Sequence, residues 1–413
     1  MTVGGTRVRF NPFSPEFRHD PYPMYRQLRE HRPVHKSLGT WVLTRHADVR
    51  AVLHDRSFSA GLIPTLVSEQ ARKLGRSDIA RVTRLGRKSL VFTDNPDHAR
   101  LRGLVNRVFT ARAVAGLRPL VTRITEELVR TARARGEFDL VADVAAPLPV
   151  TVLCEWMALP PHLRDKVGPW THDIRFLLEP GLMKAADFQR VCEVVEEFAA
   201  ALDEVLRQRR AEPGDDLISE LLAARTAGGD RLADEELIFV CVMCFVAGNE
   251  TTKSLIGNGA LALLRHPDQA ALLRERPDSA RAAVVEALRF DSPLQLTKRL
   301  ATRDTEIGGT VIAEGDQVMV CLGAANRDPE VFDRPDDFDI TRAAGDHLAF
   351  GHGMHGCLGG TLAELQAEIA FDRLFGPDAR GDLELRVDRP RYQEHSFIVR
   401  GPAALPVAAG DPR

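Results

Sequence analysis

The stretch Phe350-Gly-His-Gly-Met-His-Gly-Cys-Leu-Gly-Gly360 places one cysteine, Cys357, at the tip of a glycine-rich turn. Its glycines allow a tight bend and a close approach of the backbone to a flat partner. The apolar spacing that follows, from Leu362 to Leu374, predicts a helix beginning at about residue 361. Free N–H groups at the start of such a helix favour a thiolate over a thiol. A lone thiolate among glycines, with no second cysteine beside it, suits an axial bond to haem iron.

This run resembles the haem-binding loop of the cytochrome P-450 family, whose pattern is Phe-x-x-Gly-x-x-x-Cys-x-Gly, often with Arg or His two residues before the Cys. The matching residues are Phe350, Gly353, His355, Cys357 and Gly359. The resemblance implies a mainly α, cytochrome P-450-like fold, with a large helical domain and a small β-rich region built from both chain ends. It also implies haem b, an iron protoporphyrin IX ligated by the thiolate of Cys357, and dioxygen as co-substrate.

Bulk properties suit one large soluble globular unit. The chain has 413 residues, is 44% hydrophobic and 27% charged, and has a formal charge of −3. Because no Ser/Gly/Pro-rich stretch or like-charge block marks a linker, we expect a single domain over residues 1–413. Its β-rich region would cover approximately 20–60, 295–325 and 380–413, and its helical body approximately 61–294 and 326–379. The near-neutral charge gives no reason to expect nucleic acid as a partner.

The apolar segments and cysteines predict a cytoplasmic protein without a membrane anchor. No apolar signal segment follows Met1, and the longest apolar run, 237–247, is too short to span a bilayer. The six cysteines are scattered, as is usual in a reducing cytosol. Cys241-Val-Met-Cys244 could be a redox or metal pair. Its apolar helical setting favours core packing, and no histidine follows it as in a covalent haem site.

The remaining pattern predicts mainly helices. Residues 45–54 and much of 98–288 have helical periodicity, and 59–61 should open an irregular stretch. Prolines should break the long helical part at positions 147, 160–161, 169, 180 and 213. Strands are expected at residues 40–44, 305–312, 316–321 and 396–401.

Ala247-Gly-Asn-Glu-Thr-Thr252 lies in the middle of a helix predicted over residues 235–265. Taken alone, its threonines could simply hydrogen-bond back to their own helix. The P-450 resemblance places this segment over the distal haem face. It implies that Thr251 hydrogen-bonds the oxygen or a water there, and that Glu250 relays protons from solvent. Such an acid–alcohol pair is needed because two protons must reach the distal oxygen before its O–O bond breaks.

Four basic residues are implied to hold the haem propionates. His98 and Arg102 share one face of a predicted helix at i, i+4, a pattern that alone would indicate a solvated basic surface. By resemblance, Arg299 and His355 provide two further contacts. Arginine suits this role because its guanidinium binds carboxylates through two parallel hydrogen bonds.

Glu286-Ala-Leu-Arg289 pairs an acid and a base on one predicted helix face. The segments 127–130 and 204–207 share this pattern, and each most simply forms a surface ion pair. Position distinguishes Glu286, which precedes Cys357 by a spacing similar to that of the family. The resemblance implies that Arg342 joins Glu286 and Arg289 in a buried network that braces the cysteine loop.

The implied reaction inserts one atom of O₂ into a lipophilic organic substrate, by hydroxylation or epoxidation, and reduces the other to water. The chain has no nucleotide-binding fingerprint and no iron–sulfur cysteine spacing, so a separate ferredoxin and an NAD(P)H-dependent reductase must supply electrons. Alternatives are a peroxide-driven peroxygenase and a non-catalytic haem-binding or recruiting relative. The pair Glu250 and Thr251 argues against the first, and an intact Cys357 argues against the second.

The substrate pocket is implied to have an apolar lining with few polar anchors. Gln295 and His172 are the expected anchors. This composition fits a medium-to-large lipophilic molecule such as a polyketide, terpenoid or steroid, and favours a role in secondary-metabolite tailoring. The expected apolar lining is Leu62, Ile63, Val91, Phe176, Leu177, Leu294, Leu296 and Phe397.

Overall fold

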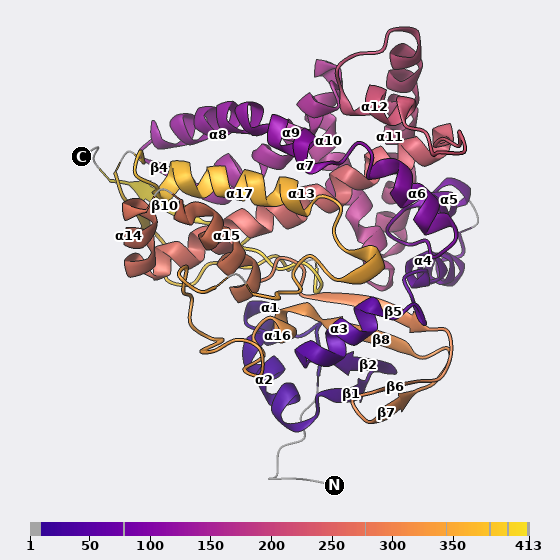
Figure 1. The fold of residues 1–413 in the computed structure, drawn as a ribbon, viewed down its shortest axis with the longest axis horizontal. Helices are drawn as coiled ribbons and strands as arrows, with labels where there is room; N and C mark the ends of the chain where they lie inside the picture. Colours follow the sequence, from indigo (N-terminus) through magenta and orange to yellow (C-terminus); the bar gives the residue numbers. More distant parts are fainter. Residues whose placement is uncertain are drawn as a thin grey trace.

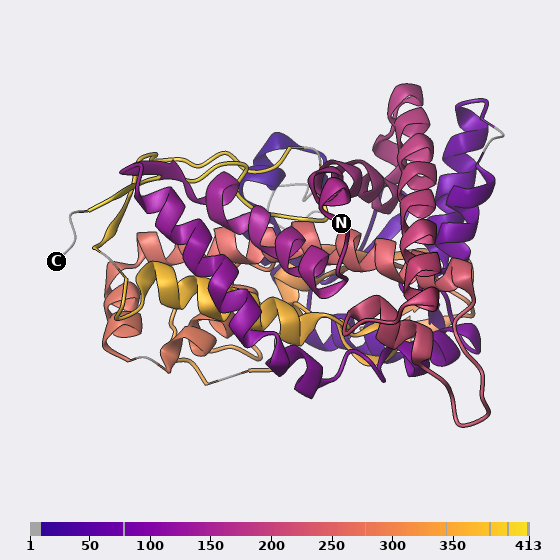
Figure 2. The same ribbon diagram turned by 90° about the horizontal axis from the view of Figure 1, so that it is seen from above.

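Helices make up most of the chain and surround one long central helix (Figures 1 and 2). The computed structural model describes residues 10–76, 79–276, 278–343, 345–379, 381–394 and 396–410. The helices are α1 Pro15–His19, α2 Tyr22–His31, α3 His46–His54, α4 Leu62–Lys73, α5 Ala80–Lys88, α6 Asp97–Val105, α7 Ala111–Gly116, α8 Arg118–Arg133, α9 Pro147–Trp156, α10 Pro161–Ile174, α11 Ala185–Ala211, α12 Leu217–Ala223, α13 Asp234–Arg265, α14 Pro267–Glu275, α15 Ser279–Phe290, α16 Leu322–Ala325 and α17 Gly360–Phe375.

Helix α13 is the centre of the helical body. It has 32 residues and packs against α9, α10, α11, α15 and α17. By length and composition it could cross a membrane, but 72% of its most apolar stretch is buried inside the protein. A helix that is apolar on all sides must be covered on all sides, which these neighbours achieve. The outer helices are amphipathic instead. In α8, for example, Val121, Ile124 and Val129 are buried at helical spacing.

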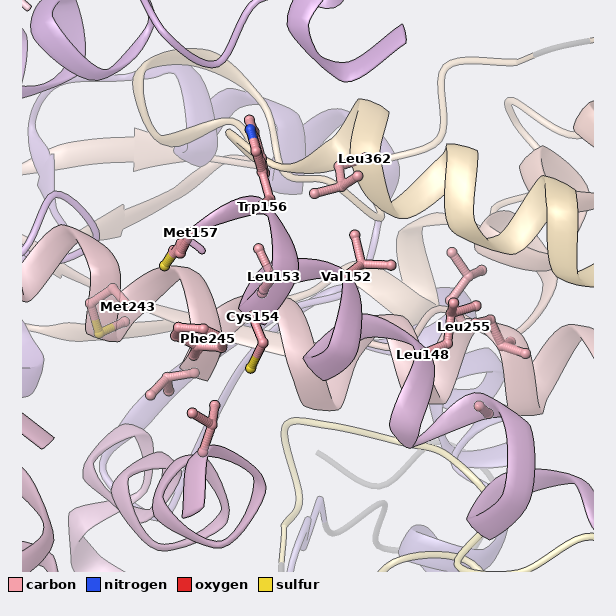
Figure 3. Close-up of a cluster of buried hydrophobic side chains, with 14 of the residues drawn as sticks. Leu148, Val152, Leu153, Cys154, Trp156, Met157, Met243, Phe245, Leu255 and Leu362 are labelled. Atoms are coloured by element: carbon pink, nitrogen blue, oxygen red, sulfur yellow. The ribbon is translucent and has the colours of Figure 1, made fainter. Parts of the chain in front are cut away.

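Helices α9 and α13 interlock through apolar side chains (Figure 3). Leu148 and Val152 of α9 are fully buried, and Leu153 lies near Met243 and Phe245 of α13. Leu362, in the first turn of α17, closes the cluster from the side of the cysteine loop. This packing fixes the start of α17 relative to the middle of α13.

A five-stranded sheet lies beside the helical body, on the lower side of Figure 1. Strand β2 pairs in parallel with β8, with Trp41 opposite Val318, and β8 pairs antiparallel with β5. The sheet therefore combines the N-terminal part of the chain with a segment that follows α15. Its strand order is β1 Val34–Ser37, β2 Thr40–Leu43, β8 Gln317–Cys321, β5 Leu296–Ala301 and β3 Phe58–Ser59.

Two smaller sheets complete the β structure. The segment 305–312, expected as one strand, is divided into β6 Thr305–Ile307 and β7 Thr310–Ile312, which pair as an antiparallel hairpin. Strands β9 Leu383–Leu385 and β10 Pro406–Ala409 pair instead with β4 Glu137–Asp139, which lies within the helical body. The far C-terminal strands therefore join the helical side, and not the five-stranded sheet assembled from the N-terminal part.

Three local expectations were wrong. The stretch after residue 61 is helical, since Pro64 stands in the first turn of α4, where its missing N–H leaves no bond unmade. Pro169 lies inside α10 without ending it. The expected strand at 396–401 is reduced to an isolated bridge between Val399 and Leu294. The hydroxyl of Ser396 accepts hydrogen bonds from the next backbone N–H groups and so replaces a strand ladder with a turn.

Candidate active site

The loop that carries Cys357 is a tight turn held against α3. Gly351 and Gly353 both have φ of 70°. A Cβ atom at Gly353 would lie 2.8 Å from the carbonyl oxygen of Leu53, so only glycine fits there. The N–H of Cys357 donates to the carbonyl of Phe350 at 2.8 Å, and α17 begins three residues later, as the sequence predicts.

The Cys357 thiol faces a cavity inside the protein, and the exposed part of its surface lies in that cavity. Its surroundings have opposite effects on its pKa. Burial raises its pKa, whereas the backbone N–H groups of Gly359 and Gly360 and the charge of Arg102 lower it. Burial is the larger effect, so the helix start alone does not make Cys357 a thiolate. A bound cation on the cavity side would supply the missing stabilisation.

A cavity of about 380 Å³ separates the cysteine loop from the middle of α13. Cys357 and Phe350 lie on one side, and Gly248, Glu250 and Thr251 on the other. Most of the remaining lining is apolar, from α4, α9, α13 and the segment around Leu294. Cys244 also lines this cavity, but burial raises its pKa to about 12. None of the six cysteines, all of which lie in the described residues, forms a disulfide, so Cys241 and Cys244 are not a disulfide pair.

The structure brings together the four predicted basic residues at the edge of this cavity. The ring centroids of His98 and His355 lie 4.4 Å apart, with the ring planes tilted by 56°. Arg102 donates to the carbonyl of Gly356 at 2.9 Å, and Arg299 donates to the carbonyl of Lys298 at 2.8 Å. His98 and Arg102 lie on one face of α6, as the sequence predicts.

One acid lies beside these four residues: the carboxylate of Asp94 is 3.7 Å from Nε2 of His355, an ion-pair distance that is too long for a hydrogen bond. Nε2 of His98 and Nε2 of His355 are buried without a hydrogen-bond partner. Burial, Arg299 and His98 lower the pKa of His355 to about 4. Burial also lowers the pKa of Arg299, to about 10. Two carboxylates would satisfy the orphaned nitrogens and the guanidinium groups, so this cluster fits the two propionates of a haem.

Glu250 and Thr251 face the cavity from α13. The Glu250 carboxylate accepts from the ammonium of Lys253 at 2.6 Å. Burial acts to raise its pKa, but Lys253, Arg175 and His172 lower it overall. The hydroxyl of Thr251 donates to the carbonyl of Ala247 at 2.5 Å. Thr251 therefore does bond back to its own helix, the alternative that the sequence left open, while also lining the cavity.

The buried network behind the loop is present. Arg289 makes two hydrogen bonds to Glu286, at 2.7 and 2.8 Å, and both side chains are 2% exposed. Arg342 lies 3.3 Å from the same carboxylate. Arg289 also donates to the carbonyl of Asn326, whose own side chain accepts from the N–H of Leu348 just before the cysteine loop.

Known proteins are similar to this chain in sequence and fold over nearly its whole length. The vitamin D(3) 25-hydroxylase of Pseudonocardia autotrophica is 38% identical over 415 residues, covering 99% of this chain and 98% of that protein. A family model described as Cytochrome P450 matches residues 172–375. This chain belongs to the cytochrome P450 family. Cytochrome P450 107B1 of Saccharopolyspora erythraea is 40% identical, covering 96% of this chain and 97% of that protein. The crystal structure of CalO2 superposes with a TM-score of 0.90 at 37% identity, covering 98% of this chain and 99% of that one.

The chain is thus a P450 monooxygenase with the mainly α fold that the sequence predicted. The P450 fold carries haem b ligated by a cysteine thiolate and uses O₂ as co-substrate. The cavity between Cys357 and α13, with the orphaned basic cluster at its edge, fits that cofactor.

The substrate side of the P450 cavity differs from the sequence expectation. Of the expected apolar lining, Ile63, Val91, Leu294 and Leu296 line it. Leu62, Phe176, Leu177 and Phe397 do not, and Leu177 and Phe397 are buried core residues.

The two expected polar anchors do not line the cavity either. Gln295 donates to Tyr22 and to the carbonyl of Ser292, and His172 lies beside Arg175. The polar lining is instead supplied by Arg175, Glu179, Lys298 and Ser396. In the sequence, Arg175 follows Asp173 at the end of α10, a pattern that alone would indicate a solvated surface.

Proposed function

We propose that this P450 hydroxylates or epoxidises a medium-to-large lipophilic metabolite in a secondary-metabolite tailoring step. One observation carries the proposal: an apolar cavity has Cys357 on one side and Glu250 with Thr251 on the other. The likeness to a vitamin D(3) 25-hydroxylase, whose name states a lipophilic substrate, agrees with it.

Each residue around the cofactor has a separate part in this proposal. Cys357 ligates the haem iron, which when bound supplies the activation of dioxygen. His98, Arg102, Arg299 and His355 hold the propionates. Binding a propionate near His355 would return its pKa toward the ordinary value, because an adjacent anion favours the charged imidazolium. Burial would then strengthen these contacts instead of opposing them.

Glu250 and Thr251 supply and position protons on the substrate side. The Glu250 carboxylate is charged and paired through Oε2 with Lys253, so protonation of Glu250 from solvent competes with that ion pair. The hydroxyl of Thr251 donates its hydrogen bond to the Ala247 carbonyl. The lone pairs of the hydroxyl oxygen can therefore accept a hydrogen bond in the cavity. The apolar walls limit the entry of water that would otherwise protonate the wrong atom.

The electron donors proposed are a ferredoxin and an NAD(P)H-dependent reductase, working in the cytoplasm without a membrane or nucleic acid. Basic residues within and after α6 are the candidate contacts for an acidic donor. Arg107 and Arg112 are exposed. Arg100 is less available, because it already pairs with Asp230 and Glu236.

Reconstitution of the purified holoenzyme tests the proposal. With ferredoxin, reductase and NADPH, we expect oxygen-dependent product from lipophilic compounds that shift the haem spin state. Product from hydrogen peroxide alone, with none from the donor system, would identify a peroxygenase instead. Spin-state shifts without product under either condition would indicate a non-catalytic relative.

The thiolate assignment has its own measurement. Cys357→Ser should abolish the ferrous–CO band typical of thiolate ligation. Cys244→Ser, which changes another cysteine of the same cavity, should keep that band. The reverse pattern would move the iron ligand to α13.

A further inference from the structure

Two cations line the substrate side of the cavity without a carboxylate partner. Arg175, just after α10, is 6% exposed, and its Nε has no hydrogen-bond partner. One of its guanidinium nitrogens lies 3.4 Å from Nε2 of His172, and the guanidinium carbon lies 4.5 Å from the centroid of the Phe176 ring. The ammonium of Lys298, on β5, lies 5.5 Å from the ring centroid of Phe397. Among the described residues, no carboxylate is within ion-pair distance, 4.0 Å, of either cation.

The nearest acid is already engaged. Glu179 is 5% exposed; its Oε2 accepts from the hydroxyl of Ser396 at 2.5 Å and its Oε1 from the N–H of Phe397 at 2.9 Å. Burial raises the pKa of Glu179, while Arg175 and Lys298 lower it, so the three charges are close although no ion pair forms. Glu179 thus offsets part of the positive charge without meeting either cation directly.

The other charges near this group are balanced among themselves. Glu250 pairs with Lys253 at 2.6 Å, and Asp173 pairs with Arg190 at 3.0 Å. Two cations and one carboxylate therefore remain, which leaves one positive charge unmatched. A buried guanidinium in this condition is strongly destabilising unless an anion completes it.

We propose that Arg175 and Lys298 bind a carboxylate of the substrate, so that this P450 oxidises a lipophilic acid. The inference rests on the proposed function and narrows its substrate class. A guanidinium fork and a point-charge ammonium together suit one carboxylate. With the acid held at this end, the carbon skeleton lies along the apolar lining toward Thr251 and Cys357, and oxidation falls at a carbon remote from the carboxylate.

The test is a set of spin-state titrations of the holoenzyme with three matched pairs. The probes are dodecanoic, hexadecanoic and lithocholic acids, each with its methyl ester, which keeps the skeleton and removes the charge. We expect at least one acid to bind about tenfold or more tightly than its ester, as one charge-assisted hydrogen bond would give. Arg175→Gln and Lys298→Gln should each remove most of that preference and leave ester binding unchanged. Arg87→Gln, an exposed arginine of α5, is the matched control and should behave as wild type.

Each outcome decides the proposal. The proposal is overturned if no acid binds more tightly than its ester. It is also overturned if both variants weaken the binding of acid and ester equally, which is the result expected of residues with a purely structural or proton-relay role. An acyl chain presented as a thioester also lacks this anion, so ester-like preference points to a carrier-bound substrate and against the proposal. Should Arg175→Gln lose its ferrous–CO band, Lys298→Gln at a half-buried position and Arg175→Lys carry the same comparison. Failure of the proposed function is a separate result, seen as no donor-dependent product from any compound.

Discussion

Removal of Arg289 tests whether the contribution of a Glu-x-x-Arg pair to the free energy of unfolding depends on its burial and not on its sequence pattern. Glu286-Ala-Leu-Arg289 and Glu204-Val-Leu-Arg207 have the same spacing on helices. The first pair is 2% exposed on both sides. The second pair is 64% exposed at the arginine and 48% at the glutamate. Arg289→Ala and Arg207→Ala are therefore a matched experiment within one protein.

The expected magnitudes follow from what each arginine contacts. Besides Glu286, Arg289 donates to the carbonyls of Asn326, Pro335 and Asp337. Its removal leaves the buried Glu286 carboxylate with Arg342 and the N–H of Asp339 as partners, and leaves three carbonyls short of a donor. Stranding one member of a buried pair costs about 3–5 kcal/mol. Loss of an exposed pair such as that of Arg207 costs about 0–1 kcal/mol.

Urea unfolding followed by far-ultraviolet circular dichroism measures both, on haem-free and haem-loaded protein. We expect a large drop in the urea midpoint for Arg289→Ala and almost none for Arg207→Ala. Glu286→Gln serves as a second probe, since it removes the charge with little change in volume. Equal midpoints for the two arginine variants would refute the reasoning that the network braces the loop.

Three further outcomes are expected. Thr251→Ala should uncouple NADPH use from product and release hydrogen peroxide; intact coupling would remove Thr251 from the proton path. Because burial, Arg299 and His98 hold the pKa of His355 at about 4, below its ordinary 6.5, the unfolded chain binds more protons between these values. The stability of the haem-free protein should therefore fall as pH drops from 6.5 toward 4, and His355→Gln should flatten that fall in urea midpoints measured across this range; an unchanged slope would contradict it. Gly353→Ala should lower haem retention in gel filtration, because its Cβ would meet the Leu53 carbonyl; full retention would show that the loop can shift.

The main fold elements were predictable where the local pattern agreed with the tertiary setting. The helix over residues 235–265 was predicted to within one residue at its start, because its apolar surface is continuous. The segment 305–312 was expected as one strand, but a turn at Gly308 and Gly309, both at positive φ, divides it into β6 and β7. The helix α4 was missed, because the stretch after residue 61 was expected to be irregular, whereas Pro64 is accommodated in a first helical turn.

The far C-terminal pairing could not be predicted, because it depends on long-range partners. Strand β10 pairs with β4 about 270 residues away (Val407 with Phe138), and neither short segment indicates the other. The Ser396 turn also has a long-range partner, because the hydroxyl that accepts from the N–H groups of Ile398 and Val399 donates to Glu179, 217 positions away in the sequence. Propensity favours a strand at 396–401 and does not indicate this contact.

The sequence indicated which residues gather on the cofactor side of the site, but it did not indicate which residues line the substrate side. The two sides differ because they face different kinds of molecule. Residues proposed to hold the haem, such as His98, Arg102 and Cys357, would all contact one rigid, flat molecule, which fixes their spacing and makes it recognisable in the sequence. The substrate side faces molecules of any shape, and its chemistry is set by which charges the fold leaves unpaired. Arg175 and His172 lie three positions apart, yet only Arg175 reaches the cavity. The unmatched charge at Arg175 and Lys298 is therefore a property of the folded protein alone, and it makes substrate charge the first quantity to vary.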